Sequence, residues 1–164
     1  MSAPFFILTL IILMVSCKAP LQVGQPAPDF TLSDQFGDIH RLSDYREQRI
    51  VLYFYPKDDT PGCTREACSI RDSFPLFLTD DIQVFGISYD TEESHRDFSA
   101  KFDLPFTLLS DSDRSVTQKY AADGQLIARR ITYLIDVNGQ IAAVLDDVDV
   151  NSHGAEILEA FSTR

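Results

Sequence analysis

Residues 50–68 read IVLYFYPKDDTPGCTREAC, and this segment predicts the central part of the fold. The first six are a continuous apolar run, which predicts a central strand covered on both faces. A turn and a helix start follow, with Thr60 as a good N-cap type and Pro61 suited to the first helical position. Cys63 then falls in the first helical turn, where unpaired N–H groups and the helix dipole favour an anion. We therefore expect a strand that leads through a turn to a reactive thiolate.

Cys63 also has a structural interpretation, because cysteine is among the most buried residue types and a helical cysteine often only packs. Against this, the thiol follows a Pro-Gly turn, and a second thiol, Cys68, lies five residues on. A structural zinc site is disfavoured, since neither a C-x-x-C pair nor paired histidines lie near these cysteines. The residues favour redox chemistry.

Residues 1–19 are expected to form a leader, and residues 20–164 a single domain. The apolar run Phe5–Val15 is long enough for a signal peptide and too short to span a bilayer. It ends just before Ser16 and Cys17, a pattern that resembles the lipobox of bacterial lipoproteins, in which Cys17 would be lipidated. We expect an exported protein, periplasmic or membrane-anchored, or a cytoplasmic one if the leader is not functional.

The composition narrows the range of partners. A net charge of −11 argues against nucleic acid and against broad attraction to anionic lipid, so any membrane contact would be through an N-terminal lipid anchor. If the chain is exported, its compartment permits disulfides. With Cys17 acylated, Cys63 and Cys68 are the cysteines left to pair. A monomer is favoured, and a dimer stays open.

The rest of the chain predicts an alternation of strands and helices. Hairpins are expected over 29–42 and over 131–145, the second with its turn at Asn138-Gly139. Between them we expect strands at 50–55, 84–88 and 106–109, helices from Pro61, over 92–102 and through 116–120, and a last helix at about 153–161. Pro75 is expected to kink or end the helix that starts at Pro61. This order predicts an α/β protein with a mixed central sheet flanked by helices, the pattern of a thioredoxin-like fold.

Residues 53–68 resemble the signature of the Q-type peroxiredoxins, also called bacterioferritin-comigratory proteins. The most specific element is Pro-x-x-x-Thr-x-x-Cys at residues 56–63, and the likeness extends from about 23 to 161. Further matching segments lie at 86–90, 94–95, 104–106, 109–111 and 130–136.

The resemblance implies a thiol peroxidase that needs no metal, haem or flavin. The Cys63 thiolate would attack hydrogen peroxide or an organic hydroperoxide and become a sulfenic acid. Cys68 would then form an intramolecular disulfide with Cys63, and a thioredoxin-like protein would restore both thiols.

The resemblance also implies roles for residues around Cys63. Thr60, Arg130 and the backbone N–H groups near Gly62 would stabilise charge on the breaking O–O bond. Pro56 would shape the pocket and shield the thiolate from water.

Arg129 is an alternative to Arg130 on sequence alone. Adjacent strand residues point to opposite faces, so only one of the two can face the thiol. The spacing to Thr132 and Asp136 selects Arg130.

The spacing of the two cysteines has a mechanical consequence. On an unbroken helix, residues five apart have Cα atoms roughly 8.7 Å from each other, whereas a disulfide needs less than about 7 Å. We therefore expect the first turns of the helix to unwind when Cys63 and Cys68 are joined.

Two alternative functions stay open. One is an exported thiol–disulfide oxidoreductase acting on protein disulfides, which usually needs a C-x-x-C pair. The other is a partner-binding lipoprotein with vestigial thiols. His95 is expected to be a surface or capping group, while His40 and His153 have no evident partner. The acidic run Asp146–Asp149 is expected to be a solvated edge rather than a calcium site.

Overall fold

The computed structural model describes residues 19–163, so residues 1–18 of the predicted leader, Cys17 among them, lie outside the described residues. The strands are β1 (Thr31–Asp34), β2 (Ile39–Arg41), β3 (Arg49–Phe54), β4 (Ile82–Ser88), β5 (Thr107–Ser110), β6 (Ile131–Ile135) and β7 (Ile141–Leu145). The helices are the 3-10 helix η1 (Leu42–Tyr45), α1 (Pro61–Thr79), α2 (Glu92–Phe102), α3 (Ser115–Lys119) and α4 (His153–Ser162).

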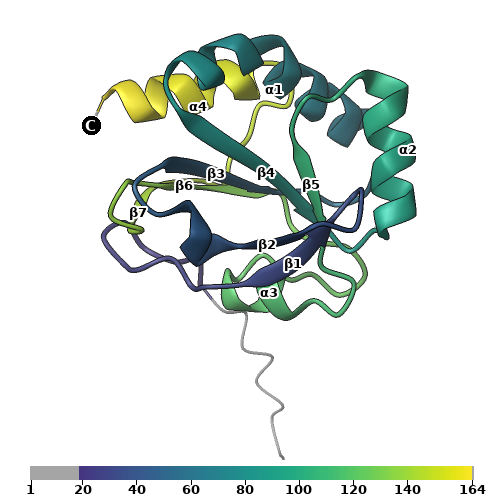
Figure 1. The fold of residues 1–164 in the computed structure, drawn as a ribbon, viewed down its shortest axis with the longest axis horizontal. Helices are drawn as coiled ribbons and strands as arrows, with labels where there is room; N and C mark the ends of the chain where they lie inside the picture. The colour runs from purple at the N-terminus through teal and green to yellow at the C-terminus, as the bar shows by residue number, and fades with distance from the viewer. Residues whose placement is uncertain (1–18, 164) are drawn as a thin grey trace, which may run out of the picture.

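All seven of these strands form one sheet in the order β2-β1-β5-β4-β3-β6-β7 (Figure 1). The central strands β3, β4 and β5 are parallel to one another. The outer strands β1, β2, β6 and β7 each pair antiparallel with their neighbours. Parallel neighbours need crossover connections, which α1 and α2 supply. The predicted mixed sheet with flanking helices is confirmed.

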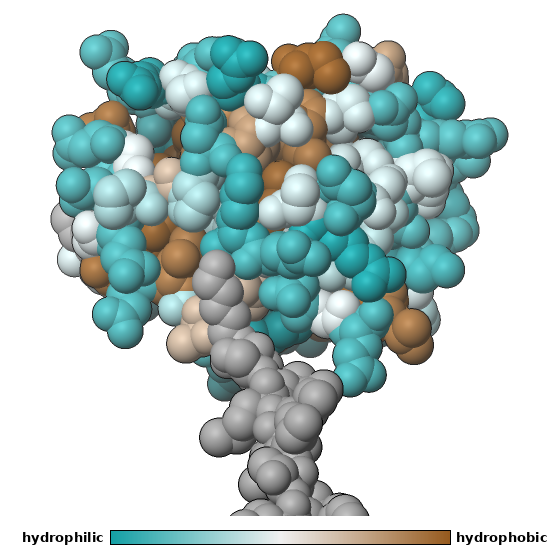
Figure 2. All heavy atoms as spheres, turned by 90° about the horizontal axis from the view of Figure 1, so that it is seen from below, coloured by the Kyte–Doolittle hydropathy of each residue, from teal (hydrophilic) through white to brown (hydrophobic). Residues whose placement is uncertain are grey.

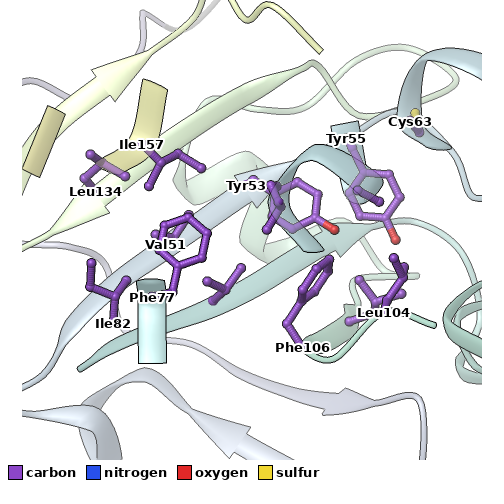
Figure 3. Packing of buried hydrophobic residues seen from close by; sticks show 14 of the residues in the cluster. Val51, Tyr53, Tyr55, Cys63, Phe77, Ile82, Leu104, Phe106, Leu134 and Ile157 are labelled. Atoms are coloured by element: carbon purple, nitrogen blue, oxygen red, sulfur yellow. The ribbon is translucent and has the colours of Figure 1, made fainter. Parts of the chain in front are cut away.

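The sheet is covered on both faces because its central strands are apolar on both sides. Along β3, Val51 and Tyr53 join the cluster under α1, α2 and α4, whereas Leu52 and Phe54 join the cluster on the opposite face. This is the period of two that a strand imposes on its side chains. Figure 3 shows the first cluster, with Cys63 at its edge beyond Tyr53.

Helix α1 does not end at Pro75, which was one of the two outcomes expected there, but runs four residues further and ends at Thr79. Pro75 is exposed, so the backbone hydrogen bond that it cannot make is lost on the solvent side. Two residues on, Phe77 is fully buried in the core. Helix α4 packs alongside α1 (Figure 1). Burial of the helix's far end outweighs the single lost hydrogen bond.

The surface is mainly hydrophilic on the face shown in Figure 2, with hydrophobic residues in separate patches. Within residues 19–163, no helix combines the length and hydropathy needed to cross a membrane. The acidic residues Asp146, Asp147 and Asp149 are exposed, as a solvated edge requires.

Candidate active site around Cys63

Cys63 lies in the first turn of α1, just beyond the end of β3. Pro61 is the first helical residue, and the Thr60 carbonyl accepts the Thr64 N–H at 2.8 Å. Thr60 is thus the N-cap, as predicted, but its side chain makes no capping hydrogen bond. The Thr60 hydroxyl instead donates to the Lys57 carbonyl at 2.9 Å. The first-turn N–H groups are therefore not used by Thr60, which leaves them able to meet an anion.

The sulfur of Cys63 has a cationic neighbour. Arg130 Nη2 donates to Cys63 Sγ at 3.4 Å. Arg130 directly precedes β6, and Ile131 pairs with Phe54 at the end of β3, so strand pairing carries the guanidinium to the start of α1. Arg129 turns away and donates to the Ala121 carbonyl at 3.0 Å. The structure thus places Arg130, and not Arg129, beside the thiol.

Arg130 is shared between the thiol and a buried carboxylate. Its Nη1 donates to Glu66 Oε2, and Glu66 is fully buried. Burial raises the pKa of Glu66 to about 7, although the positive charge of Arg130 acts in the opposite direction. Sequence reasoning missed Glu66. A signal was available, since residues three apart on a helix share a face, and Glu66 is three residues after Cys63.

Behind Glu66 lies a second buried polar group, His153, at the start of α4. Its Nε2 is 2.8 Å from Thr132 Oγ1 and 3.9 Å from Glu66 Oε1. Its Nδ1 is 3.1 Å from Glu156 Oε2. Burial lowers the pKa of His153. Glu66 Oε1 itself has no hydrogen-bond partner, so the carboxylate depends on Arg130 for compensation of its charge.

Gly62 and Pro56 are both half-buried; Gly62 directly precedes Cys63, and Pro56 lies at the start of the loop that leads to α1. A Cβ atom at Gly62 would lie 3.3 Å from Arg130 Nη2, closer than most side chains tolerate. The absence of a side chain at Gly62 thus lets the guanidinium approach the helix start.

Cys68 is half-buried, and both it and Cys63 are free thiols in one continuous helix. Because α1 is unbroken between them, helix geometry keeps their Cα atoms roughly 8.7 Å apart, too far for a disulfide. The thiols therefore cannot be bridged in this conformation. No group of three or more His, Cys, Asp or Glu side chains able to hold a metal ion occurs in the described part of the chain.

Two histidines have surroundings that the sequence did not indicate. His95 is fully buried and contacts Asp58, so the expectation of a surface or capping group was wrong. Its position three residues before the buried Phe98 puts it on the inner face of α2. His40 contacts Asp34 and Tyr45 through its two ring nitrogens.

Comparison with known proteins gives consistent matches. Residues 23–144 match the model of the AhpC/TSA family. Peroxiredoxin Bcp of Bacillus subtilis is 40% identical over 147 residues, which cover 85% of this chain and 94% of that protein. A cysteine-to-serine mutant of PrxQ from Xylella fastidiosa superposes with a TM-score of 0.84 at 29% identity, covering 89% of this chain and 98% of that one.

A further solved structure is that of the bacterioferritin comigratory protein of Xanthomonas campestris. It matches with a TM-score of 0.80 at 29% identity, covering 87% of this chain and 98% of that chain. That protein is described as having alkyl peroxide reduction activity.

Proposed function

The chain belongs to the AhpC/TSA family, and we propose that it reduces hydroperoxides with Cys63 as the attacking thiol. The observation that carries this proposal is the Arg130 guanidinium 3.4 Å from Cys63 Sγ, at the mouth of a helix whose N-cap side chain leaves the first-turn N–H groups unused. Positive charge and fixed donors thus converge where an oxygen–oxygen bond would break.

In the first step the Cys63 thiolate attacks the nearer oxygen of the hydroperoxide. A sulfur–oxygen bond forms, the O–O bond breaks, and the departing oxygen takes a proton to leave as water or an alcohol. Cys63 becomes a sulfenic acid. Arg130 stabilises the developing negative charge, and Thr60 Oγ1, whose proton is directed at Lys57, can accept the hydroperoxide O–H.

In the second step the Cys68 thiol attacks the sulfenic sulfur. A sulfur–sulfur bond forms and the hydroxyl leaves with a proton as water. Because the two cysteines share an unbroken helix, the turns between them must unwind first. A thioredoxin-like dithiol then reduces the disulfide and returns both residues to thiols.

The substrates include hydrogen peroxide and organic hydroperoxides. The alkyl peroxide reduction of the related Xanthomonas campestris protein supports the second class. A disulfide oxidoreductase is disfavoured, because exchange through a C-x-x-C pair needs no unwinding, whereas here four residues separate the cysteines.

The location is part of the same proposal. The apolar run Phe5–Val15 supports export, and Ser16 before Cys17 supports lipidation of Cys17. Mass spectrometry of the native protein tests both, because a mature chain that begins at an acylated Cys17 has a defined mass. A native chain that begins at Met1 without acyl groups contradicts this part of the proposal.

The catalytic proposal is tested by single-turnover oxidation. One equivalent of hydrogen peroxide or of an alkyl hydroperoxide should consume the Cys63 thiol rapidly, and Cys63→Ser should abolish the reaction. Cys68→Ser should still react once and accumulate a sulfenic acid that dimedone traps. Reduction of insulin disulfides without peroxide consumption would instead favour the oxidoreductase.

A further inference from the structure

A buried polar pair lies in the core beside the loop that leads to Cys63. Asp58 is 6% exposed and His95 is fully buried. The Tyr55 hydroxyl donates to Asp58 Oδ1 at 2.7 Å, and the Ser94 hydroxyl donates to Asp58 Oδ2 at 2.7 Å. His95 Nδ1 meets the same Oδ2 at 2.9 Å. Three side chains therefore converge on one buried carboxyl group.

The ring of His95 is held at both nitrogens. Nδ1 faces the Asp58 carboxyl group, and Nε2 is 3.2 Å from the Leu109 carbonyl oxygen, which can only accept. With Nε2–H directed at Leu109, the Nδ1···Oδ2 contact also needs a proton, because two facing lone pairs would repel in a buried site. His95 thus joins Asp58, on the loop, to β5.

Asp58 fixes the loop that begins at Pro56 and ends at Thr60. The Asp58 N–H donates to Asp90 Oδ2 at 2.9 Å, and Asp59 forms an exposed ion pair with Lys101 at 2.6 Å. These two contacts tie the loop to α2 and to the residues before it. The buried contact with His95 lies nearest the core and is the least screened by solvent.

We propose that His95 is a positioning residue for peroxide reduction, acting through Asp58 on the loop 56–60. This inference rests on the proposed function. The hydrogen-bonding groups around a bound hydroperoxide come from two sides: Arg130, just before β6, donates, and at the end of the loop Thr60 accepts, next to the N–H groups at the start of α1. Arg130 contacts Cys63 and Glu66 of α1 directly, whereas Thr60 is held in place relative to Arg130 through the loop, and a displacement of about 1 Å can slow a reaction up to about a hundredfold.

Two isosteres of His95 separate positioning from simple packing. In His95→Asn the amide nitrogen can replace Nδ1 and donate to Asp58, whereas in His95→Gln it can replace Nε2 and donate only to Leu109. We expect His95→Gln to slow oxidation of the Cys63 thiol by about tenfold or more, and His95→Asn to stay within about threefold of wild type. Asp97→Asn, an exposed change on the same helix, should leave the rate unchanged.

The readouts are the second-order rate with hydrogen peroxide, the thermal midpoint, and amide hydrogen exchange over 56–60. Equal rate losses in the Asn and Gln variants, in step with equal losses of thermal stability, would show a packing role only and overturn the proposal. If His95→Gln does not fold, Ser94→Ala removes another donor to the same Oδ2 and should slow the reaction about threefold.

The experiments distinguish failure of the proposed peroxidase function from failure of the proposed role of His95. Wild-type protein that does not consume peroxide refutes the peroxidase, whatever the variants do. The exchange measurement still tests in that case whether His95 holds the loop 56–60 through Asp58. Exchange over 56–60 should be faster in His95→Gln than in His95→Asn, and equal exchange would show that His95 does not hold the loop.

Discussion

Replacing Glu66 by glutamine should remove a pH-dependent loss of stability. Burial raises the pKa of Glu66 from 4.5 to about 7 in the folded protein, and the unfolded chain returns it to its ordinary value. Between these values the native state holds a proton that the unfolded state has released, so stability falls as pH rises through the window. At about 1.4 kcal/mol per tenfold change, the full loss is about 3 kcal/mol and is complete above pH 7.

His153 contributes with the opposite sign. Burial lowers its pKa, so the unfolded state binds the extra proton in acid and stability falls as pH decreases below the ordinary histidine value. The pH dependence of the wild-type unfolding free energy therefore contains contributions from both Glu66 and His153. Subtracting the unfolding free energy of Glu66→Gln from that of wild type at each pH removes most of the His153 contribution and leaves that of Glu66.

The measurement is urea unfolding at pH 5, 6, 7 and 8. The wild-type value minus the Glu66→Gln value should fall by about 2.5 kcal/mol from pH 5 to pH 8, given the shift above. Glu159→Gln, an exposed change on α4, should give a nearly flat difference. Arg130→Met removes the cation that opposes the raised pKa of Glu66, so the pH range over which stability falls should extend to higher pH. A flat difference for Glu66→Gln would refute the reasoning.

Three further predictions concern the thiols. Arg130→Ala should slow oxidation of Cys63 by about a hundredfold or more in stopped-flow assays, far more than Arg129→Ala, and equal losses would contradict the assignment. Gly62→Ala should slow the same step several-fold while the thermal midpoint stays close to wild type, because its Cβ displaces the guanidinium; an unchanged rate would show that Arg130 adjusts. Oxidation with one equivalent of hydroperoxide should lower the helical circular dichroism, and identical spectra of the two forms would exclude unwinding.

Most of the secondary structure could be predicted because its signals are local. The apolar run at 50–55 became β3, shifted by one residue, and the helix expected over 92–102 is α2 with the same bounds. The Asn138-Gly139 turn formed because Gly139 adopts a φ of 76°, a conformation open to glycine. These features depend on neighbours in the sequence alone.

The pairings between the polar groups around the site could not be predicted in the same way, because the partners are distant in the sequence. Arg130 and Glu66 are 64 residues apart, and His95 and Asp58 are 37 apart. Pairs of this kind are fixed by strand order and helix packing, which no local pattern encodes. Tertiary packing also overrode the local rule for Pro75, where burial of the helix beyond it decided the outcome.

The proposed disulfide step would place opposite demands on α1, which would have to unwind near its start and stay packed beyond it. Two sets of contacts, one on each side of the cysteines, are compatible with both demands. On one side, the loop 56–60 is held at Asp58. On the other, Gly154 of α4 lies so close to α1 that a Cβ there would collide with the Ser69 carbonyl, and its N–H donates to Ser69 Oγ at 3.1 Å. Cys63 and Cys68 lie between these contacts. In the proposed mechanism, unwinding up to Cys68 would therefore break about two turns of helix, while the part that buries Phe77 would keep its contacts.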